Sequence, residues 1–171
     1  MWYPGRVQTP TQPAFWKLFR PKACSIGLAA TSKEDALAEM VANLVDGGSL
    51  PAELSEAALG ALSEREALAS AGVGQNVAIP HVQLDGLTTA VANLGIHHEG
   101  LDWAAVDGDV VHVCFTVLRP AGPSTDHDPE RHLEMMRWIA RLARERDFRL
   151  FAMQARTRTE LVDLLKEMSH V

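Results

Sequence analysis

The chemistry that this chain could do is concentrated in one stretch, GVGQNVAIPH, which ends at His81. His81 directly follows Pro80 and a turn with two glycines, which predicts a histidine held at the rim of a sheet with one ring nitrogen facing solvent. A neutral imidazole is a good nucleophile near neutral pH, because imidazole titrates at a pH of about 6.5. A single histidine is more often structural than catalytic, so this interpretation needs support from other residues.

Two further residues favour a phosphoryl group as the species that His81 would accept. Arg65 is the only lysine or arginine between positions 34 and 118, among 13 acidic residues, and a guanidinium holds phosphoryl oxygens by paired hydrogen bonds. His132 follows Pro129 in the first turn of an expected helix, where free backbone amides attract anions. The alternatives are a surface helix position for Arg65 and an exposed helix start for His132.

The segment SEREALASAGVGQNVAIPH, Ser63–His81, resembles the phosphorylation-site signature of the EIIA type-2 domain of the bacterial phosphoenolpyruvate-dependent phosphotransferase system. That family includes the fructose/mannitol type and the nitrogen-regulatory type. Its pattern has an arginine at a helix end, then Ser-Thr-Gly-x-Gly, then Ala-Ile-Pro-His. His132 with Leu133 resembles the family's His-Leu pair, and the likeness covers roughly residues 22–168. The matching positions of the signature are Arg65, Ser70, Gly72, Gly74, Ala78, Ile79, Pro80 and His81.

The resemblance implies an α/β fold, with a mixed β-sheet flanked by helices on both faces, and no metal or organic cofactor. It implies that His81 accepts a phosphoryl group from an HPr-like phosphocarrier protein. His81 would then pass the group to an EIIB domain, or the phosphorylated protein would act as a regulatory signal. Arg65 and His132 would stabilise the phosphoryl group beside it.

Three positions depart from the family pattern. Ala71 stands where the family usually has threonine, and Val82 and Gln83 stand where it often has glycine and then arginine or lysine. These changes remove a hydroxyl and a positive charge near His81. The second hypothesis is therefore a regulatory protein-interaction module of the same fold without relay turnover, which leaves enzymatic activity open. A third is an unrelated α/β protein.

Hydrophobic periodicity predicts alternating strands and helices, which by itself favours an α/β or an α+β fold in layers. The long helix near the C-terminus is expected to turn Leu133, Met136, Ile139, Ala140 and Ala143 inward. The nearly unbroken apolar run 110–118 predicts a central strand. The other expected strands are 22–30 and 88–97, with a turn over 70–76 and an extended piece over 77–81. The expected helices cover about 31–45, with Thr31 and Glu34 as a capping box and Gly47-Gly48 at its end, then 51–68, 129–146, 147–155 and a last helix after the box formed by Thr157 and Glu160.

Residues 1–21 hold four of the nine prolines and two of the four tryptophans, which predicts an irregular arm before a domain over 22–171. The arm is rich in aromatic residues. They either pack back onto the domain, which is favoured, or form a contact in a homodimer or with a partner. These residues are Trp2, Phe15, Trp16 and Phe19.

Composition sets outer limits on the function. Hydrophobic residues make up 47% and charged residues 22% of the chain, as in an ordinary globular protein. The net charge of −6, with an acidic middle, disfavours nucleic acid as the main partner and favours a basic protein. The uncharged, largely apolar run Ala23–Ser32 is too short to span a bilayer.

Cysteine and histidine usage gives the remaining expectations. Cys24 and Cys114 fit neither a metal spacing nor a disulfide framework, so a reducing cytoplasm is the default location. Histidines other than His81 and His132 lack a paired cysteine or glutamate signature, so no metal site is expected. Three arginines recur at helical spacing and form either a solvated face or a docking face for an acidic partner. They are Arg137, Arg141 and Arg144.

Overall fold

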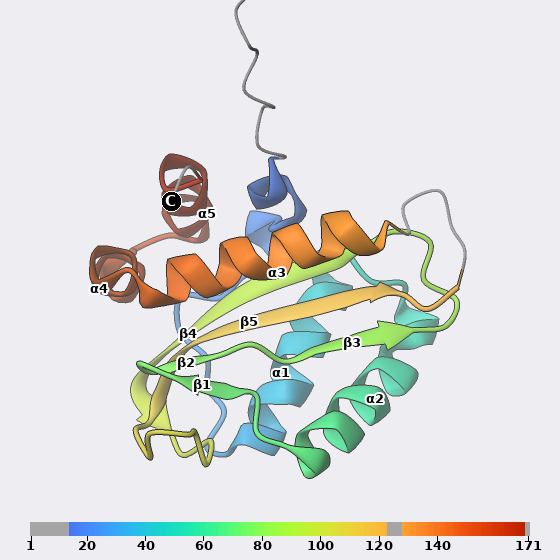
Figure 1. Cartoon of the computed structure of the whole chain (residues 1–171), viewed down its shortest axis with the longest axis horizontal. Coiled ribbons are helices and arrows are strands. Elements are labelled where there is room, and N and C mark those ends of the chain that lie inside the picture. The colour runs from blue at the N-terminus through green and yellow to red at the C-terminus, as the bar shows by residue number, and fades with distance from the viewer. Residues whose placement is uncertain (1–13, 123–127, 170–171) are drawn as a thin grey trace, which may run out of the picture.

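The computed structural model describes residues 14–122 and 128–169, and within them one mixed five-stranded sheet carries helices on both faces (Figure 1). This arrangement confirms the fold class expected from the sequence. The strands are β1 Gly72–Gly74, β2 Val77–Ala78, β3 His81–Leu84, β4 Val91–Leu101 and β5 Val111–Pro120. The helices are α1 Lys33–Asp46, α2 Ser55–Leu68, α3 Pro129–Arg144, α4 Arg146–Gln154 and α5 Arg158–Glu167, with 3-10 turns η1 Phe15–Leu18, η2 Pro21–Ala23 and η3 Ala52–Leu54.

β5 is the central strand, as its apolar run predicted. It pairs antiparallel with β4 along one edge and parallel with β2 and β3 along the other. β2 and β3 follow each other along β5, and Val117 N donates to Pro80 O in the gap between them. Pro80 therefore lies in the link between two strands, where its missing amide hydrogen costs no ladder bond.

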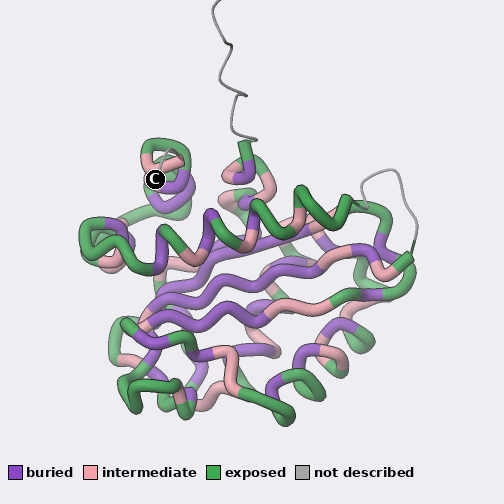
Figure 2. Tube along the Cα trace, in the orientation of Figure 1, coloured by how far each residue is buried: buried purple, intermediate pink, exposed green. Residues whose placement is uncertain are grey.

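The two faces of β5 enter different halves of the core. Val113, Phe115 and Val117 pack with α3, α4 and α5, whereas Cys114 and Leu118 pack with α1 and α2. Figure 2 shows the strands buried between the two helical layers. Burial on both faces is the physical reason why this strand reads as a continuous apolar run instead of an alternating one.

The helix ends follow local capping chemistry. α1 is capped by Ser32, whose hydroxyl accepts from Asp35 N, so the cap lies one residue after the expected Thr31. Thr31 instead donates to the Asp35 carboxylate. Gly47 ends α1 as expected. The Thr157 cap of α5 is confirmed, because its side chain accepts from Glu160 N.

The strand expected over 22–30 is wrong. Residues 21–23 form η2, and the chain then follows β4 through only a few backbone hydrogen bonds, among them Ser25 N to Leu94 O. The amides of Ala29 and Ala30 donate to the Glu39 carboxylate instead of to a neighbouring strand. A side chain of α1 has taken the donors that a strand would have needed.

The turn expected over 70–76 is also partly wrong, because 72–74 form β1 and the turn itself is Gln75–Asn76. The inward face of α3 is rotated from the expected one. Leu133 is 49% exposed, while Met135, Trp138 and Leu142 are buried together with the expected Ile139 and Ala143. The large Trp138 indole packs against Phe15 and Phe19 and fixes which side of α3 faces the core.

Part of the expected N-terminal arm packs back onto the domain. Phe15 is 4% exposed and Phe19 is 1% exposed, and Phe19 also meets Phe115 edge to face. Trp16 is partly buried at the edge of the core, and the Lys166 ammonium lies over its ring. Trp2 lies outside the described residues, so the division into an arm over 1–21 and a domain over 22–171 stays a prediction. In the described ranges, no helix is long and apolar enough to cross a bilayer.

Candidate functional site

His81 opens β3 and is half-buried. Its Nδ1 lies 2.7 Å from the carbonyl oxygen of Ile79. A carbonyl oxygen can only accept a hydrogen bond, so Nδ1 of the neutral ring carries the proton and Nε2 carries the lone pair. The local backbone therefore leaves Nε2 as the ring nitrogen with the free lone pair.

The strand before His81 is tied to α2 through a buried carboxylate. Ile79 N donates to Ala71 O at 2.9 Å, and Ala71 N donates to Glu66 Oε2 at 3.0 Å. Glu66 is 8% exposed and also accepts from Lys33 Nζ at 3.4 Å. Because Ile79 provides the acceptor for His81, Glu66 helps to fix the orientation of the imidazole from behind.

A tight hairpin turn fixes the start of the same strand. Gln75 and Asn76 have φ angles of 55° and 66°, as two-residue hairpin turns require. Asp107 accepts hydrogen bonds from the backbone amides of Gln75 and Asp109, and these bonds lower the pKa of its carboxyl. Asn76 Nδ2 donates to Val110 O at 2.8 Å. The turn is thus pinned to the loop that precedes β5.

Gly72 is needed at its position because of a close approach. A Cβ atom built there would lie 2.8 Å from the Cβ of Ala105, which is closer than real side chains come. Gly72 of the signature therefore has a packing role, independent of any bound group.

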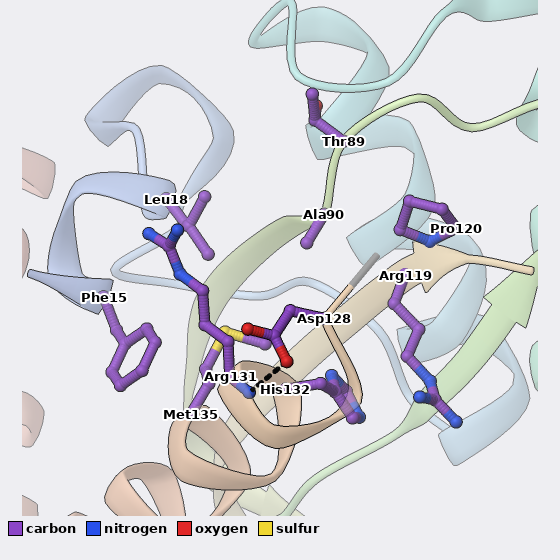
Figure 3. Close-up of a pocket in the computed structure, with 10 residues that line it drawn as sticks. All are labelled: Phe15, Leu18, Thr89, Ala90, Arg119, Pro120, Asp128, Arg131, His132 and Met135. Carbon is purple, nitrogen blue, oxygen red and sulfur yellow. Dashed lines mark hydrogen bonds between the residues drawn. The ribbon is translucent and has the colours of Figure 1, made fainter. Parts of the chain in front are cut away.

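His132 lies in the first turn of α3, and Asp128 caps the N-terminal end of this helix. The Asp128 carboxylate accepts from Glu130 N and Arg131 N, and Pro129 occupies the first helical position. His132 borders a pocket of about 130 Å³, together with Arg119 from the end of β5. Figure 3 shows the side chains of His132 and Arg119 extending on the same side of α3, whereas Arg131 extends toward Leu18.

His81 and His132 lie on the same face of the sheet. Leu84 and the partly buried Val82 pack on the α1–α2 side, so the alternating positions His81 and Gln83 face the α3 side. His81 also pairs in register with Val117, which belongs to the core half beneath α3. The sheet therefore directs His81 toward the layer that contains His132.

Arg65 lies on the other face, in the last turn of α2. Its side chain is exposed, and Arg65 Nη1 donates to Ala69 O at 3.2 Å. α2 packs against β3, but this hydrogen bond directs the guanidinium to the end of its own helix. The role of Arg65 beside His81 stays a prediction.

Sequence reasoning missed Arg119, which lies just beyond the strand expected over 110–118. β5 continues to Pro120, and Arg119 pairs in register with Gln83. A basic residue at the end of an otherwise apolar strand was the available signal. Its significance depends on strand register, which periodicity alone does not give.

The two cysteines are not candidate nucleophiles. Burial raises the pKa of the Cys24 thiol to about 11 and that of Cys114 to about 12. Both thiols therefore stay protonated near neutral pH. Within residues 14–122 and 128–169, no three histidine, cysteine or acidic side chains gather as metal ligands would.

A protein-family model matches most of the chain. The model is described as the EIIA 2 component of the phosphoenolpyruvate-dependent sugar phosphotransferase system, and it matches residues 17–168. The chain belongs to this EIIA 2 family. Membership confirms the family expected from the residues around His81.

Individual relatives agree with the family model. A fructose-specific EIIA component from Haloferax volcanii is 30% identical over 137 residues, which are 80% of this chain and 84% of that protein. The nitrogen regulatory protein IIA-Ntr from Neisseria meningitidis superposes with a TM-score of 0.72 at 24% identity, over 88% of this chain and 97% of that one. A mannitol EIIA solved in complex with phosphorylated EIIB from Escherichia coli superposes with a TM-score of 0.62 at 16% identity, over 85% of this chain and 95% of that one.

These findings support the function expected for an EIIA 2 protein, which is phosphoryl relay or regulation. An interaction module without relay turnover is not favoured. The two superposed structures, both under 25% identical to this chain, show a shared fold.

Proposed function

We propose that this EIIA 2 protein accepts a phosphoryl group on Nε2 of His81 and passes it to a second protein. The observation that carries the proposal is the 2.7 Å contact between His81 Nδ1 and Ile79 O. That contact holds the proton on Nδ1 and leaves the Nε2 lone pair for phosphorus. His81 also lies on an outer strand of the sheet, where a second protein has access to it.

The transfer needs no proton movement at His81. The P–N bond of the donor breaks, and the donor nitrogen keeps the bonding electron pair. A new P–N bond forms to His81 Nε2, while Nδ1 keeps its proton on Ile79 O. Because the transition state of phosphoryl transfer is loose, the protein acts mainly by positioning and by stabilising charge on the phosphoryl oxygens.

The surroundings of His81 suit a reaction between two proteins. Val77 and Ile79, which precede His81 in the chain, are both buried. Val73, in the neighbouring hairpin, is 52% exposed. Val73 and Ile79 border a groove against Ala140 and Ala143 of α3. Such apolar surface reduces the number of competing waters when a partner docks.

The donor that fits this chemistry is a phosphohistidine on an HPr-like phosphocarrier protein. The acceptor is an EIIB domain, a proposal supported by the mannitol EIIA solved with phosphorylated EIIB. The nitrogen regulatory relative supports a second use, in which a target protein senses whether His81 is phosphorylated. A homodimer stays a prediction.

Labelling with radioactive phosphoenolpyruvate, enzyme I and HPr tests the proposal. We expect acid-labile label on the wild-type protein and none on His81→Ala. His98→Ala is the matched control, because His98 is exposed and its ring bonds to Ile26 O away from the site. Label that persists on His81→Ala, or no label on the wild type with any phosphocarrier tried, overturns the proposal.

A further inference from the structure

We propose that Arg119 is a phosphoryl-binding residue, whose guanidinium holds the oxygens of the group on His81. This inference rests on the proposed function of His81. Arg119 comes from β5, the strand to which β3 is paired along its whole length. The signature around His81 does not contain it.

Strand register brings Arg119 close to His81. His81 pairs with Val117 and Gln83 pairs with Arg119, so Arg119 lies two residues further along the adjacent strand. Two residues of a strand span about 6.6 Å, and neighbouring strands lie about 4.8 Å apart. An arginine side chain is long enough to bridge a separation of this order.

Both side chains also point to the same face. Val117 packs in the half of the core beneath α3, and Arg119 follows it with the two-residue period of a strand. Residues at paired positions of neighbouring strands project to the same side, so Gln83 and His81 share this face. Arg119 and His81 are therefore diagonal neighbours on one surface.

His132, in the first turn of α3, lies beside Arg119. Arg119 and His132 border one pocket, and Figure 3 shows both side chains on the same side of the first turn of α3. A dianion on His81 Nε2 would face a guanidinium from β5 and an imidazole from α3. Charge-assisted hydrogen bonds from such donors are the strongest that a phosphoryl group finds in a protein.

Arg119 is available for this task, unlike Arg65 and Arg149. Its side chain is half-buried, and within the described residues the structure gives its guanidinium no hydrogen bond or ion pair. By contrast, Arg65 donates to Ala69 O, and Arg149 donates to Gln75 and to Ala143 O. β3 itself, HVQL, supplies no lysine or arginine.

Arg119 takes no proton in the reaction. It donates N–H groups to the non-bridging oxygens while the donor P–N bond breaks and the bond to His81 Nε2 forms. Since charge on these oxygens changes during transfer, the interaction acts on the transition state as well as on the phosphorylated product.

The test compares Arg119→Ala, Arg119→Lys and Arg146→Ala in single-turnover phosphorylation by phospho-HPr. We expect Arg119→Ala to lower the maximal rate about 100-fold with little change in the half-saturating phospho-HPr concentration, as for loss of one transition-state donor. Arg119→Lys should recover part of the rate. Arg146→Ala, which removes an exposed charge from α4, should match the wild type.

A second measurement separates charge stabilisation from a structural role. In a ³¹P NMR titration of the phosphorylated protein, Arg119→Ala should raise the pH at which the phosphoryl group takes up a proton, because a guanidinium favours the dianion. A wild-type rate and an unshifted titration in Arg119→Ala overturn the assignment of Arg119. Label persisting on His81→Ala overturns the proposed function instead, so the two failures are distinguishable.

Discussion

The carbonyl oxygen of Ile79 and Nδ1 of His81 lie 2.7 Å apart, two residues from each other where the link between β2 and β3 meets β3. Pro80 between them has a fixed φ, which restricts the backbone at the point where the imidazole turns back to the Ile79 carbonyl. A backbone atom thus determines which nitrogen of the imidazole can react.

The position of the phosphoryl group follows from this contact. We expect phosphorylation to place phosphorus on Nε2 and to leave the proton on Nδ1. Long-range ¹H–¹⁵N spectra of histidine-labelled protein should show one protonated Nδ1 for His81 before transfer and a shifted Nε2 resonance after it. A phosphoryl group found on Nδ1 would contradict the proposed geometry.

Glu66→Ala should destabilise the fold by about 1–3 kcal/mol, because it leaves the half-buried amide of Ala71 without its acceptor. Glu66→Gln keeps an acceptor oxygen and should cost less. Urea unfolding measures both, with Glu64→Ala as the control on the exposed side of the same helix. Equal midpoints for Glu66→Ala and Glu64→Ala would show that the buried contact contributes nothing.

Glu66→Ala should also slow labelling of His81 in the fraction that remains folded. The Glu66 carboxylate accepts a hydrogen bond from Ala71 N, and Ala71 O accepts one from Ile79 N. Ile79 O in turn accepts one from Nδ1 of the His81 imidazole. The rate is compared with that of Glu66→Gln at a urea concentration where both are folded. Unchanged labelling would limit Glu66 to a structural role.

Asp107→Asn should lower the melting temperature at pH 6 and should have no effect at strongly acidic pH. The amides of Gln75 and Asp109 lower the pKa of the Asp107 carboxyl from its ordinary value of 3.8. A lowered pKa means that the ionised carboxylate contributes stability above pH 3.8, and that this contribution is lost as the pH falls through the folded-state pKa. Melting curves of both proteins from pH 6 to pH 2 measure the difference, and a gap that stays constant over this range contradicts the assignment.

The sequence predicted the features that depend on local pattern. The apolar run of β5, the glycine end of α1 and the Thr157 cap are all short-range signals, and all three are confirmed. The strand expected over 22–30 is wrong because Glu39, on the following helix α1, takes the amides of Ala29 and Ala30. Competition of a side chain for backbone donors leaves no trace in periodicity.

The same distinction applies to the candidate site. His81 carries a recognisable motif, and the structure adds its tautomer through Ile79 O. The place of Arg119 beside it depends on the pairing of β3 with β5, which the sequence does not specify. The rotated face of α3 has a similar origin, since Phe15 and Phe19 from the chain start determine where Trp138 packs.

β5 is both the hydrogen-bonding partner of the segment that carries His81 and the strand shared by the two halves of the core. Heat or denaturant cannot loosen this strand without separating the helical layers as well. Loss of phosphoryl acceptance and global unfolding should therefore coincide in a single cooperative transition, so the protein has no partly melted form that is folded yet inactive.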